Sequence, residues 1–383
     1  MTQRSSFTSN SDLAARHLTG RVLSTALWLV VWLAVIDIFI NLAFAYPRDP
    51  KNTAPGGLRL YFDYGRSVEG KLIRETRSDS KETAPITLAG WYDPLVINEP
   101  ASDSSKEIVS IYGMSHAMRL GLALDRTSNR FAARRIGAPG ASSNWSYGAY
   151  LRDHGGGKSK AAVLAFLSSN LAAITTMSSM TWGIDLPNPY TSDRFFVRDG
   201  GLDVVHPPYA SFKDYVAALS DSSKWAAAKS VFAKNDTMYN EFLISRSVLD
   251  SSSLFRLMRR AYGQRYFREK RKEALDQNGF RPESEQVKVA QAMVRGFAAD
   301  ARKNGMTPVI FIANNFGYSD FLFQALEPAL VADNIPYLNS AAIISPDDPR
   351  GYLPDSHFTD QNDEKLSKAL ERIILANESA SVR

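Results

Sequence analysis

An α/β protein with a parallel sheet, preceded by an apolar helix that spans a membrane, is the fold that the sequence predicts. From Lys106 onward, short runs rich in Val, Ile, Ala and Phe alternate with amphipathic segments of helical length. This alternation is typical of a parallel sheet covered by helices. Nearer the amino terminus, Val22–Tyr46 is apolar over more than the ~20 residues that a helix needs to cross a bilayer.

The apolar segment is expected to be an uncleaved signal anchor. Arg4, Arg16 and Arg21 precede it together with a single aspartate. Because positive charges are retained on the cytoplasmic side, this imbalance places residues 1–21 in the cytoplasm and everything after the segment outside. Residues 22–46 would then cross the membrane once.

Two alternatives to the anchor remain open. Ala43-Phe44-Ala45 has the small-x-small pattern of a signal-peptidase site, although the apolar run exceeds the roughly 7–15 residues of an ordinary signal peptide. A buried core helix is the other alternative. Asp37 and Asn41, one helical turn apart, interrupt the apolar run near its end. They either lie at the membrane interface or contact a partner helix in the membrane.

The elements of the sheet domain follow from local patterns. Strands are expected where apolar, β-branched runs stand between turn residues, at Glu107–Tyr112, Phe131–Ile136, Ala161–Phe166, Thr307–Ala313 and Ile335–Leu338. Helices are expected where apolar residues recur at helical spacing, at Ala117–Thr127, Glu283–Lys303, Phe321–Ala332 and Gln361–Ala376.

The chain is expected to form one catalytic domain over residues 106–379, preceded by a linker and juxtamembrane segment at 47–105. A helical insertion at about 182–278 separates the third and fourth strands. The insertion ends in a basic run from Arg256 to Lys272. This run is either a solvated helix face or a surface that binds an anionic glycan or lipid headgroups.

Composition excludes several classes of chemistry. The chain has no cysteine, and therefore no disulfide, thiol nucleophile or cysteine-ligated metal. It shows no P-loop, zinc-ligand spacing or RNA-binding aromatic signature, and its net charge of +5 is spread along the chain. We therefore predict no cofactor, no metal and no nucleic-acid partner.

Residues for nucleophilic catalysis stand at the two ends of the sheet region. Ser115 follows the first strand in a Gly-x-Ser turn, and Asp355 and His357 precede the last helix. A serine hydroxyl needs an adjacent base, and the base needs an orienting acid. His116 directly follows the serine and points in a different direction, so His357 is the better candidate for the base.

The order of these residues resembles the SGNH/GDSL hydrolase superfamily, over roughly residues 106–378 without the insertion. Gly113-Met114-Ser115 matches the nucleophile block, and Asp355 and His357 match the last block. Gly140, after the second strand, and Asn170, after the third, match the blocks that supply oxyanion donors. The resemblance implies a three-layer α/β/α, flavodoxin-like fold. It also implies an oxyanion hole formed by the Ser115 N–H, the Gly140 N–H and the Asn170 amide. Asn144 and Asn314-Asn315 are competitors for the role of Asn170.

Three positions depart from the pattern of that superfamily. Met114 replaces the usual Asp of the serine block, and Leu171 follows the asparagine where the superfamily has Asp. The usual D-x-x-H is shortened to Asp355-Ser356-His357. This shortened form resembles the membrane-tethered SGNH-like O-acetyltransferases that modify exported polysaccharides, which also carry an amino-terminal anchor.

The resulting hypothesis is a serine acyltransferase anchored in the bacterial inner membrane, with its catalytic domain in the periplasm. It would O-acetylate an envelope or exported polysaccharide through a Ser115 acyl-enzyme. The partners implied are a glycan or acyl-ester substrate, the membrane itself and a membrane protein that donates the acyl group. A carbohydrate or lipid esterase is the first alternative, and a catalytically silent scaffold that binds glycan is the second.

Overall fold

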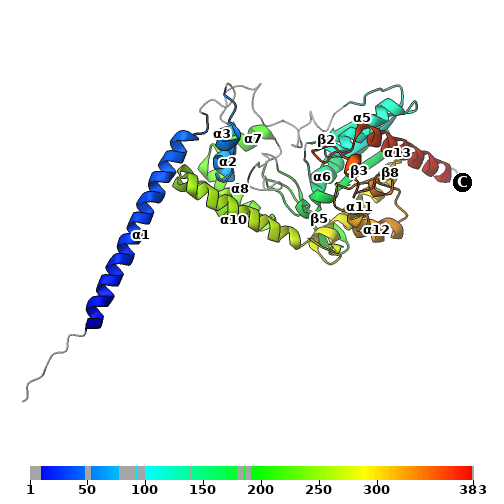
Figure 1. The fold of residues 1–383 in the computed structure, drawn as a ribbon. Helices are drawn as coiled ribbons and strands as arrows, with labels where there is room; N and C mark the ends of the chain where they lie inside the picture. Colours follow the sequence, from blue (N-terminus) through cyan, green and yellow to red (C-terminus); the bar gives the residue numbers. More distant parts are fainter. Residues whose placement is uncertain are drawn as a thin grey trace, which may run out of the picture.

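A five-stranded parallel sheet lies at the centre of the larger part of the molecule (Figure 1). The structure is a computed structural model that describes residues 10–47, 53–76, 92, 100–138, 140–178, 185, 191–209 and 211–381. The sheet strands are β1 (Glu107–Gly113), β2 (Phe131–Gly137), β3 (Ser159–Leu167), β8 (Thr307–Ala313) and β9 (Tyr337–Asn339). These are the five strands expected from sequence, with small differences at their ends.

The strands lie in the order β2-β1-β3-β8-β9, and every neighbouring pair is parallel. The chain leaves β1 toward β2 on one side and later returns to β3 on the other side. The direction of winding therefore reverses between β1 and β3. In open α/β sheets such a reversal leaves a crevice beyond the carboxyl ends of the two strands, where ligands bind.

Helices cover both faces of the sheet, so the domain has three layers. The helices α5 (Ser115–Thr127) and α13 (Asp360–Ser381) pack together on one face. On the other face lie α6 (Ser143–Asp153) and α11 (Glu285–Lys303), with α12 (Phe321–Ala332) beside α11. Figure 1 shows α5 and α13 on one side of the strands and α11 and α12 on the other.

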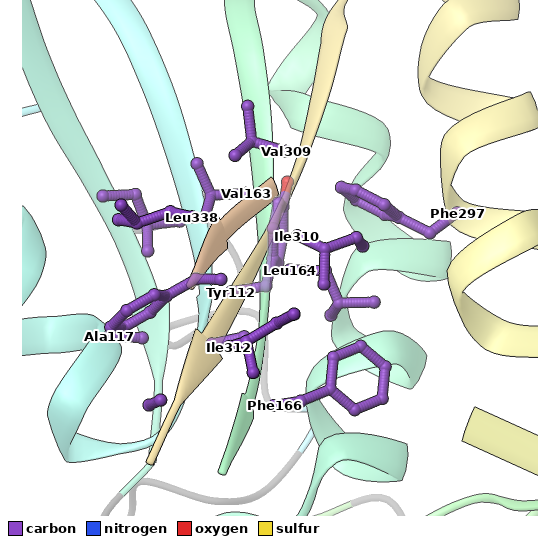
Figure 2. Packing of buried hydrophobic residues seen from close by; sticks show 14 of the residues in the cluster. Tyr112, Ala117, Val163, Leu164, Phe166, Phe297, Val309, Ile310, Ile312 and Leu338 are labelled. Atoms are coloured by element: carbon purple, nitrogen blue, oxygen red, sulfur yellow. The ribbon is translucent and has the colours of Figure 1, made fainter. Parts of the chain in front are cut away.

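The core explains why the strand runs are apolar throughout. From Ala161 to Phe166, β3 has no exposed side chain, because it is covered on both faces as in other parallel sheets. Figure 2 shows Leu164 and Phe166 turned toward Phe297 of α11, while Ala117 of α5 lies on the opposite side of the sheet.

The helix α6 is an element that the sequence patterns do not predict. Its residues Ser143 to Tyr150 are all buried, including Ser143, Asn144 and Ser146. A helix buried on every side has no polar face and therefore no apolar stripe at helical spacing. Short 3₁₀ turns complete the sheet domain at η1 (His154–Gly157), η2 (Ser168–Ala173), η4 (Ser340–Ala342) and η5 (Pro349–Gly351).

The insertion between β3 and β8 builds a second hydrophobic core. It contains the hairpins β4 (Arg194–Arg198) with β5 (Gly201–Val205) and β6 (Leu275–Asp276) with β7 (Gly279–Phe280). Its helices are α7 (Phe212–Leu219), α8 (Ser222–Asn235), α9 (Glu241–Ile244), η3 (Val248–Ser251) and α10 (Ser253–Lys272).

Part of the expected linker belongs to this second core. The segment 47–105 contains the helices α2 (Gly57–Asp63) and α3 (Val68–Thr76). Val68 and Leu72 of α3 are buried together with Tyr215 of α7 and Trp225 of α8. The second core is therefore assembled from two stretches of chain that lie on either side of the first three sheet strands.

The helix α1 (Asn10–Ala43) stands apart from both cores at the amino-terminal end (Figure 1). Within it, Arg21–Ala43 is long and apolar enough to span a membrane, and none of that span's most apolar window is buried in the protein. The structure therefore does not support the buried-core-helix alternative. An exposed apolar helix near the amino terminus suits both a membrane anchor and a signal sequence.

Candidate active site

Ser115 stands where β1 meets α5, at the carboxyl edge of the sheet. Gly113 ends β1, Met114 occupies the N-cap position, and Ser115 is the first residue of α5. A Cβ on Gly113 would lie 2.5 Å from the Cβ of Ala117 and 2.7 Å from that of Ala165. The tight packing of this turn therefore requires glycine. It leaves Ser115 half-buried at the start of a helix.

Ser115, His357 and Asp355 form one chain of hydrogen bonds. The Nε2 atom of His357 lies 2.7 Å from the Ser115 Oγ, and the Nδ1 atom lies 3.0 Å from the Asp355 Oδ2. In the arrangement that satisfies both contacts, Ser115 donates to Nε2 and the Nδ1–H donates to the carboxylate. The structure thus brings together the three residues that the sequence nominated from opposite ends of the domain.

A tight turn, rather than an extended loop, allows Asp355 to reach His357 across one residue. Ser356 has a φ of +68°, in the left-handed region. The His357 backbone N–H donates to the Asp355 Oδ1 at 3.2 Å, so one carboxylate oxygen holds the backbone and the other holds the ring. These two hydrogen bonds from His357 lower the pKa of Asp355.

His116 packs against the ring of His357. Its ring stacks on that of His357 with the centroids 4.7 Å apart, and its Nε2 lies 3.2 Å from the Ser356 carbonyl oxygen. Because a carbonyl only accepts, Nε2 carries the hydrogen. Burial, reinforced by the neighbouring His357, lowers the pKa of His116 to about 4. The ring is therefore neutral at pH 7 and positions the turn at Ser356.

Arg119, one helical turn after Ser115, ties the serine helix to the histidine loop. Its guanidinium donates to the Phe358 carbonyl at 3.0 Å, and to the carboxylates of Asp360 and Asp363 at 2.8 Å each. The three acceptors lie immediately after His357 and at the start of α13. Sequence patterns gave no indication of this role or of the role of His116, because both depend on contacts across about 240 residues.

The proposed oxyanion donors lie on segments that adjoin one another at the same edge of the sheet. Gly140 has a φ of +66°, which favours glycine. The Ala138 N–H in its loop donates to the Gly113 carbonyl at 3.3 Å. From the end of β3, Asn170 is buried, and its Nδ2 donates to the Ala141 carbonyl at 3.2 Å.

The competing asparagines hold the surrounding structure together. Asn144 donates both amide hydrogens, to the Thr176 and Asp193 carbonyls at 2.7 and 2.8 Å. Asn314 donates to the Asn339 side chain at 3.2 Å, and the Asn315 Oδ1 accepts from the Ser169 N–H at 3.1 Å. Among the described residues, the Asn170 amide donates one hydrogen bond, to the Ala141 carbonyl.

The two apolar departures from the family pattern lie in the core. Met114 and Leu171 are both fully buried in the hydrophobic cluster of the sheet domain. A charged residue at either position would need a buried partner. Both side chains therefore contribute packing at these positions, and the Ser115–His357–Asp355 contacts form beside them.

Two further sources of functional information are possible metal ligands among the described residues and similarity to known proteins. Among the residues that the structure describes, no group of three or more His, Asp or Glu side chains is placed to hold a metal ion. No protein-family model matches the chain, and no curated protein matches it. The geometry of the site therefore carries the functional conclusion by itself.

Proposed function

We propose that the protein is a membrane-anchored serine acyltransferase, and that it O-acetylates an envelope or exported polysaccharide. The observation that carries the proposal is the continuous hydrogen-bond chain from Ser115 through His357 to Asp355. A half-buried serine with a histidine at 2.7 Å and a carboxylate behind it has the geometry of an activated nucleophile.

In this mechanism the Ser115 Oγ attacks the carbonyl carbon of an acyl ester while His357 Nε2 accepts its proton. Asp355 keeps the hydrogen on Nδ1 and stabilises the imidazolium. The tetrahedral oxyanion receives hydrogen bonds from the Ser115 N–H, the Gly140 N–H and the Asn170 amide, each worth ~3 kcal/mol in the transition state. Collapse expels the alcohol of the donor, which takes the proton from His357.

The second half of the reaction decides the product. A hydroxyl group of the glycan gives its proton to His357 and attacks the acyl carbon bound to Ser115. The new ester leaves, and the proton on His357 returns to the Ser115 oxygen. Water in place of the glycan hydroxyl would make the protein an esterase, with the same three residues in the same roles.

The order of the sheet supports assignment to the SGNH/GDSL superfamily. Numbered along the chain, the strands follow the order 2-1-3-4-5, which is the flavodoxin-like order. Ser115 follows the first of these strands and Asn170 the third, so both border the crevice where the winding reverses.

The apolar helix supports the location. With α1 as an anchor and its arginines in the cytoplasm, the catalytic domain faces the periplasm, where envelope polysaccharides are assembled. An acyl group from cytoplasmic metabolism must then cross the membrane. This need implies a membrane protein that delivers it to Ser115.

Turnover of p-nitrophenyl acetate by the purified full chain tests the nucleophile. Ser115→Ala is expected to reduce the rate by ~10³-fold or more. Ser104→Ala, at an exposed turn before β1, is the matched control and should retain the wild-type rate. Equal rates for the wild type and Ser115→Ala would refute the assignment of Ser115 as the nucleophile.

Product analysis separates the two reactions. Candidate polysaccharides are added to the acetylated wild-type protein, and the products are followed by NMR. Acetyl ester on the glycan supports the transferase. Release of free acetate alone, at a rate that the glycan leaves unchanged, would assign the protein as an esterase.

A further inference from the structure

The polar pair in α1 is bonded to the amino terminus of α10. The Asp37 Oδ1 accepts from the Leu254 N–H at 2.8 Å, at the second residue of α10. The Asn41 Oδ1 accepts from the Ser253 hydroxyl at 2.8 Å and from the Arg256 guanidinium at 3.2 Å. The unpaired N–H groups and positive dipole end of a helix favour a carboxylate there. The partner helix is therefore supplied by the insertion of the same chain.

One stripe of α1 continues this junction. Asp37, Ile40, Asn41 and Phe44 are half-buried, while Ile38, Phe39 and Leu42 between them are exposed. Phe44 stacks on Phe62 of α2 at 5.2 Å. Arg256 is buried and also donates to the Phe62 carbonyl at 2.7 Å. The last turns of α1 are thus fixed to α2 and α10 by polar and aromatic contacts.

The junction sets the height of α10 above the bilayer. A membrane span of ~20 residues that begins at Arg21 ends close to Asn41. The amino terminus of α10 then lies at the outer edge of the hydrocarbon. Figure 1 shows α10 leaving the upper end of α1 and running sideways toward the sheet domain. Its 20 residues extend over ~30 Å.

Beside the junction, the surface is apolar. Met258 and Tyr262, one turn apart on α10, are 63% and 45% exposed. Phe242 of α9 is 44% exposed and contacts the Tyr262 ring edge-on at 5.4 Å. Val248 and Leu249 of η3, just before α10, are exposed as well. The insertion therefore exposes several large apolar side chains close in sequence to the residues that contact α1.

Farther along, the same stripe of α10 becomes cationic. Arg265, Arg268 and Lys272 follow Met258 and Tyr262 at helical spacing, and all three are exposed. Lys272 pairs with Glu269, whereas the described residues offer Arg265 and Arg268 no hydrogen-bond or ion-pair partner. An apolar half followed by a basic half is the pattern of helices that lie in a membrane interface.

We infer that this face of α10 rests on the outer surface of the membrane. Met258 and Tyr262 enter the interface beside α1, and Arg265, Arg268 and Lys272 bind the phosphates of anionic lipids. This placement rests on the proposed membrane anchor and goes beyond the proposed reaction. Lipid is favoured over glycan as the occupant because hydrogen bonds join the amino terminus of α10 to the end of the apolar span, and exposed apolar side chains follow within the first turns of α10.

A fluorescence-quenching experiment tests the placement in the full chain. Because the chain has no cysteine, single probes can be attached to Met258→Cys, Arg265→Cys and Arg350→Cys. The proteins are reconstituted in nanodiscs of phosphatidylcholine, with or without phosphatidylglycerol, containing lipids with a nitroxide on the headgroup. We expect quenching at Met258→Cys and Arg265→Cys and none at Arg350→Cys, whose native side chain is 89% exposed on the sheet domain. Equal quenching at all three positions, or at none, overturns the placement.

Charge reversal tests the lipid recognition. Arg265→Glu combined with Arg268→Glu should weaken quenching of the Met258→Cys probe in phosphatidylglycerol discs, and Arg350→Glu should not. Thermal unfolding confirms that each variant is folded. Quenching that is indifferent to phosphatidylglycerol and to the reversals would overturn recognition of anionic lipid. Protection of Arg265→Cys from labelling by an anionic polysaccharide, without quenching in discs, would assign the face to a polymer instead.

A probe at Val30→Cys separates failure of the anchor from failure of this inference. Nitroxides on the acyl chains should quench it if α1 spans the bilayer. Quenching at Val30→Cys without quenching at Met258→Cys would refute the surface contact alone. Absence of quenching at Val30→Cys would refute the anchor and the surface contact together.

Discussion

At the scale of single residues, Ser356 determines whether the Asp355–His357 pair can form. Its left-handed backbone turns the Asp355 carboxylate back toward both the N–H and the ring of the histidine. A left-handed conformation costs an ordinary residue roughly 1–2 kcal/mol, and more for a β-branched side chain. The neighbouring contacts of His116 and Leu353 hold the strained turn in place.

The turn at Ser356 is therefore expected to tolerate glycine and to reject valine. Ser356→Gly should keep p-nitrophenyl acetate turnover within a few-fold of wild type, because glycine adopts this φ without strain. Ser356→Val should lower kcat strongly, because relaxing its φ separates Asp355 from His357. The two kcat values check this expectation, and similar losses in both variants would contradict it.

His116 makes the stability of the fold depend on pH. Its pKa is about 4 in the folded protein and near 6.5 in an unfolded chain. The unfolded state therefore binds more protons between these values, and the free energy of unfolding falls as the pH drops from about 6.5 to about 4. His116→Asn retains a donor for the Ser356 carbonyl. In this variant the decrease in the free energy of unfolding between pH 6.5 and pH 4 should be smaller by about 3 kcal/mol. Denaturant titrations at pH 4 and 7 measure the free energy of unfolding of the wild type and of His116→Asn. The same loss of stability in both proteins between pH 7 and pH 4 would refute the role of His116.

At the scale of elements, the site depends on how α5 is joined to α13. Arg119 contributes the main polar connection, and its partner Asp363 is buried. Removing one member of a buried ion pair leaves the other charged and unpaired. The helix that carries Ser115 and the loop that carries His357 are thus connected by this guanidinium in addition to the contact of His116 with Ser356.

Arg119→Met is expected to lower the free energy of unfolding by about 3 kcal/mol. It should also reduce kcat by a larger factor than the factor by which it changes KM. Arg126→Met is the matched control on the same helix, because its ion pair with Glu364 is long, 3.9 Å, and exposed. It should cost less than about 1 kcal/mol. Combining Arg119→Met with Asp363→Asn should recover part of the lost stability. Equal costs for the two arginines would refute this role.

The sequence predicted the sheet elements well because parallel strands are buried on both faces. Uniform apolar runs such as Ala161–Phe166 follow directly from that burial. The same criterion failed for α6, whose buried polar residues hide its helical period. At the site, Ser115, Asp355 and His357 followed from chain order and neighbouring strands. The roles of His116, Arg119 and Ser356 could not be predicted, since they arise from contacts across the fold and from a backbone conformation.

At the scale of the whole molecule, the described residues form an apolar helix and two hydrophobic cores joined at defined contacts. The sheet domain holds the proposed catalytic residues, and the second core lies between it and α1. The insertion therefore connects the apolar helix to the domain that carries Ser115 and His357. The position of Ser115 relative to α1 depends on the hydrogen bonds of Asp37 and Asn41 together with the Phe44–Phe62 stacking.

Replacing Asp37 and Asn41 of α1 should loosen the connection between α1 and the rest of the molecule without unfolding either core. Spin labels at Val30→Cys and Arg265→Cys are expected to give a narrow distance distribution in the otherwise unmodified chain, measured by pulsed electron resonance. Adding Asp37→Leu and Asn41→Leu should broaden it, because the amino terminus of α10 loses its acceptors, a cap worth ~1 kcal/mol. An unchanged distribution would show that aromatic contacts alone hold the junction.

The stiffness of this junction changes how the proposed enzyme would search for its substrates. A catalytic domain on a flexible tether of n residues explores a volume with a radius of about 5–6 Å × √n. A domain that is fixed rigidly to its anchor instead stays at a constant distance from the membrane surface while the helix diffuses laterally. A membrane-bound acyl donor of matching height would then meet Ser115 by two-dimensional diffusion. The glycan is not confined to the membrane, so it would be modified only where it comes within that distance of the membrane surface.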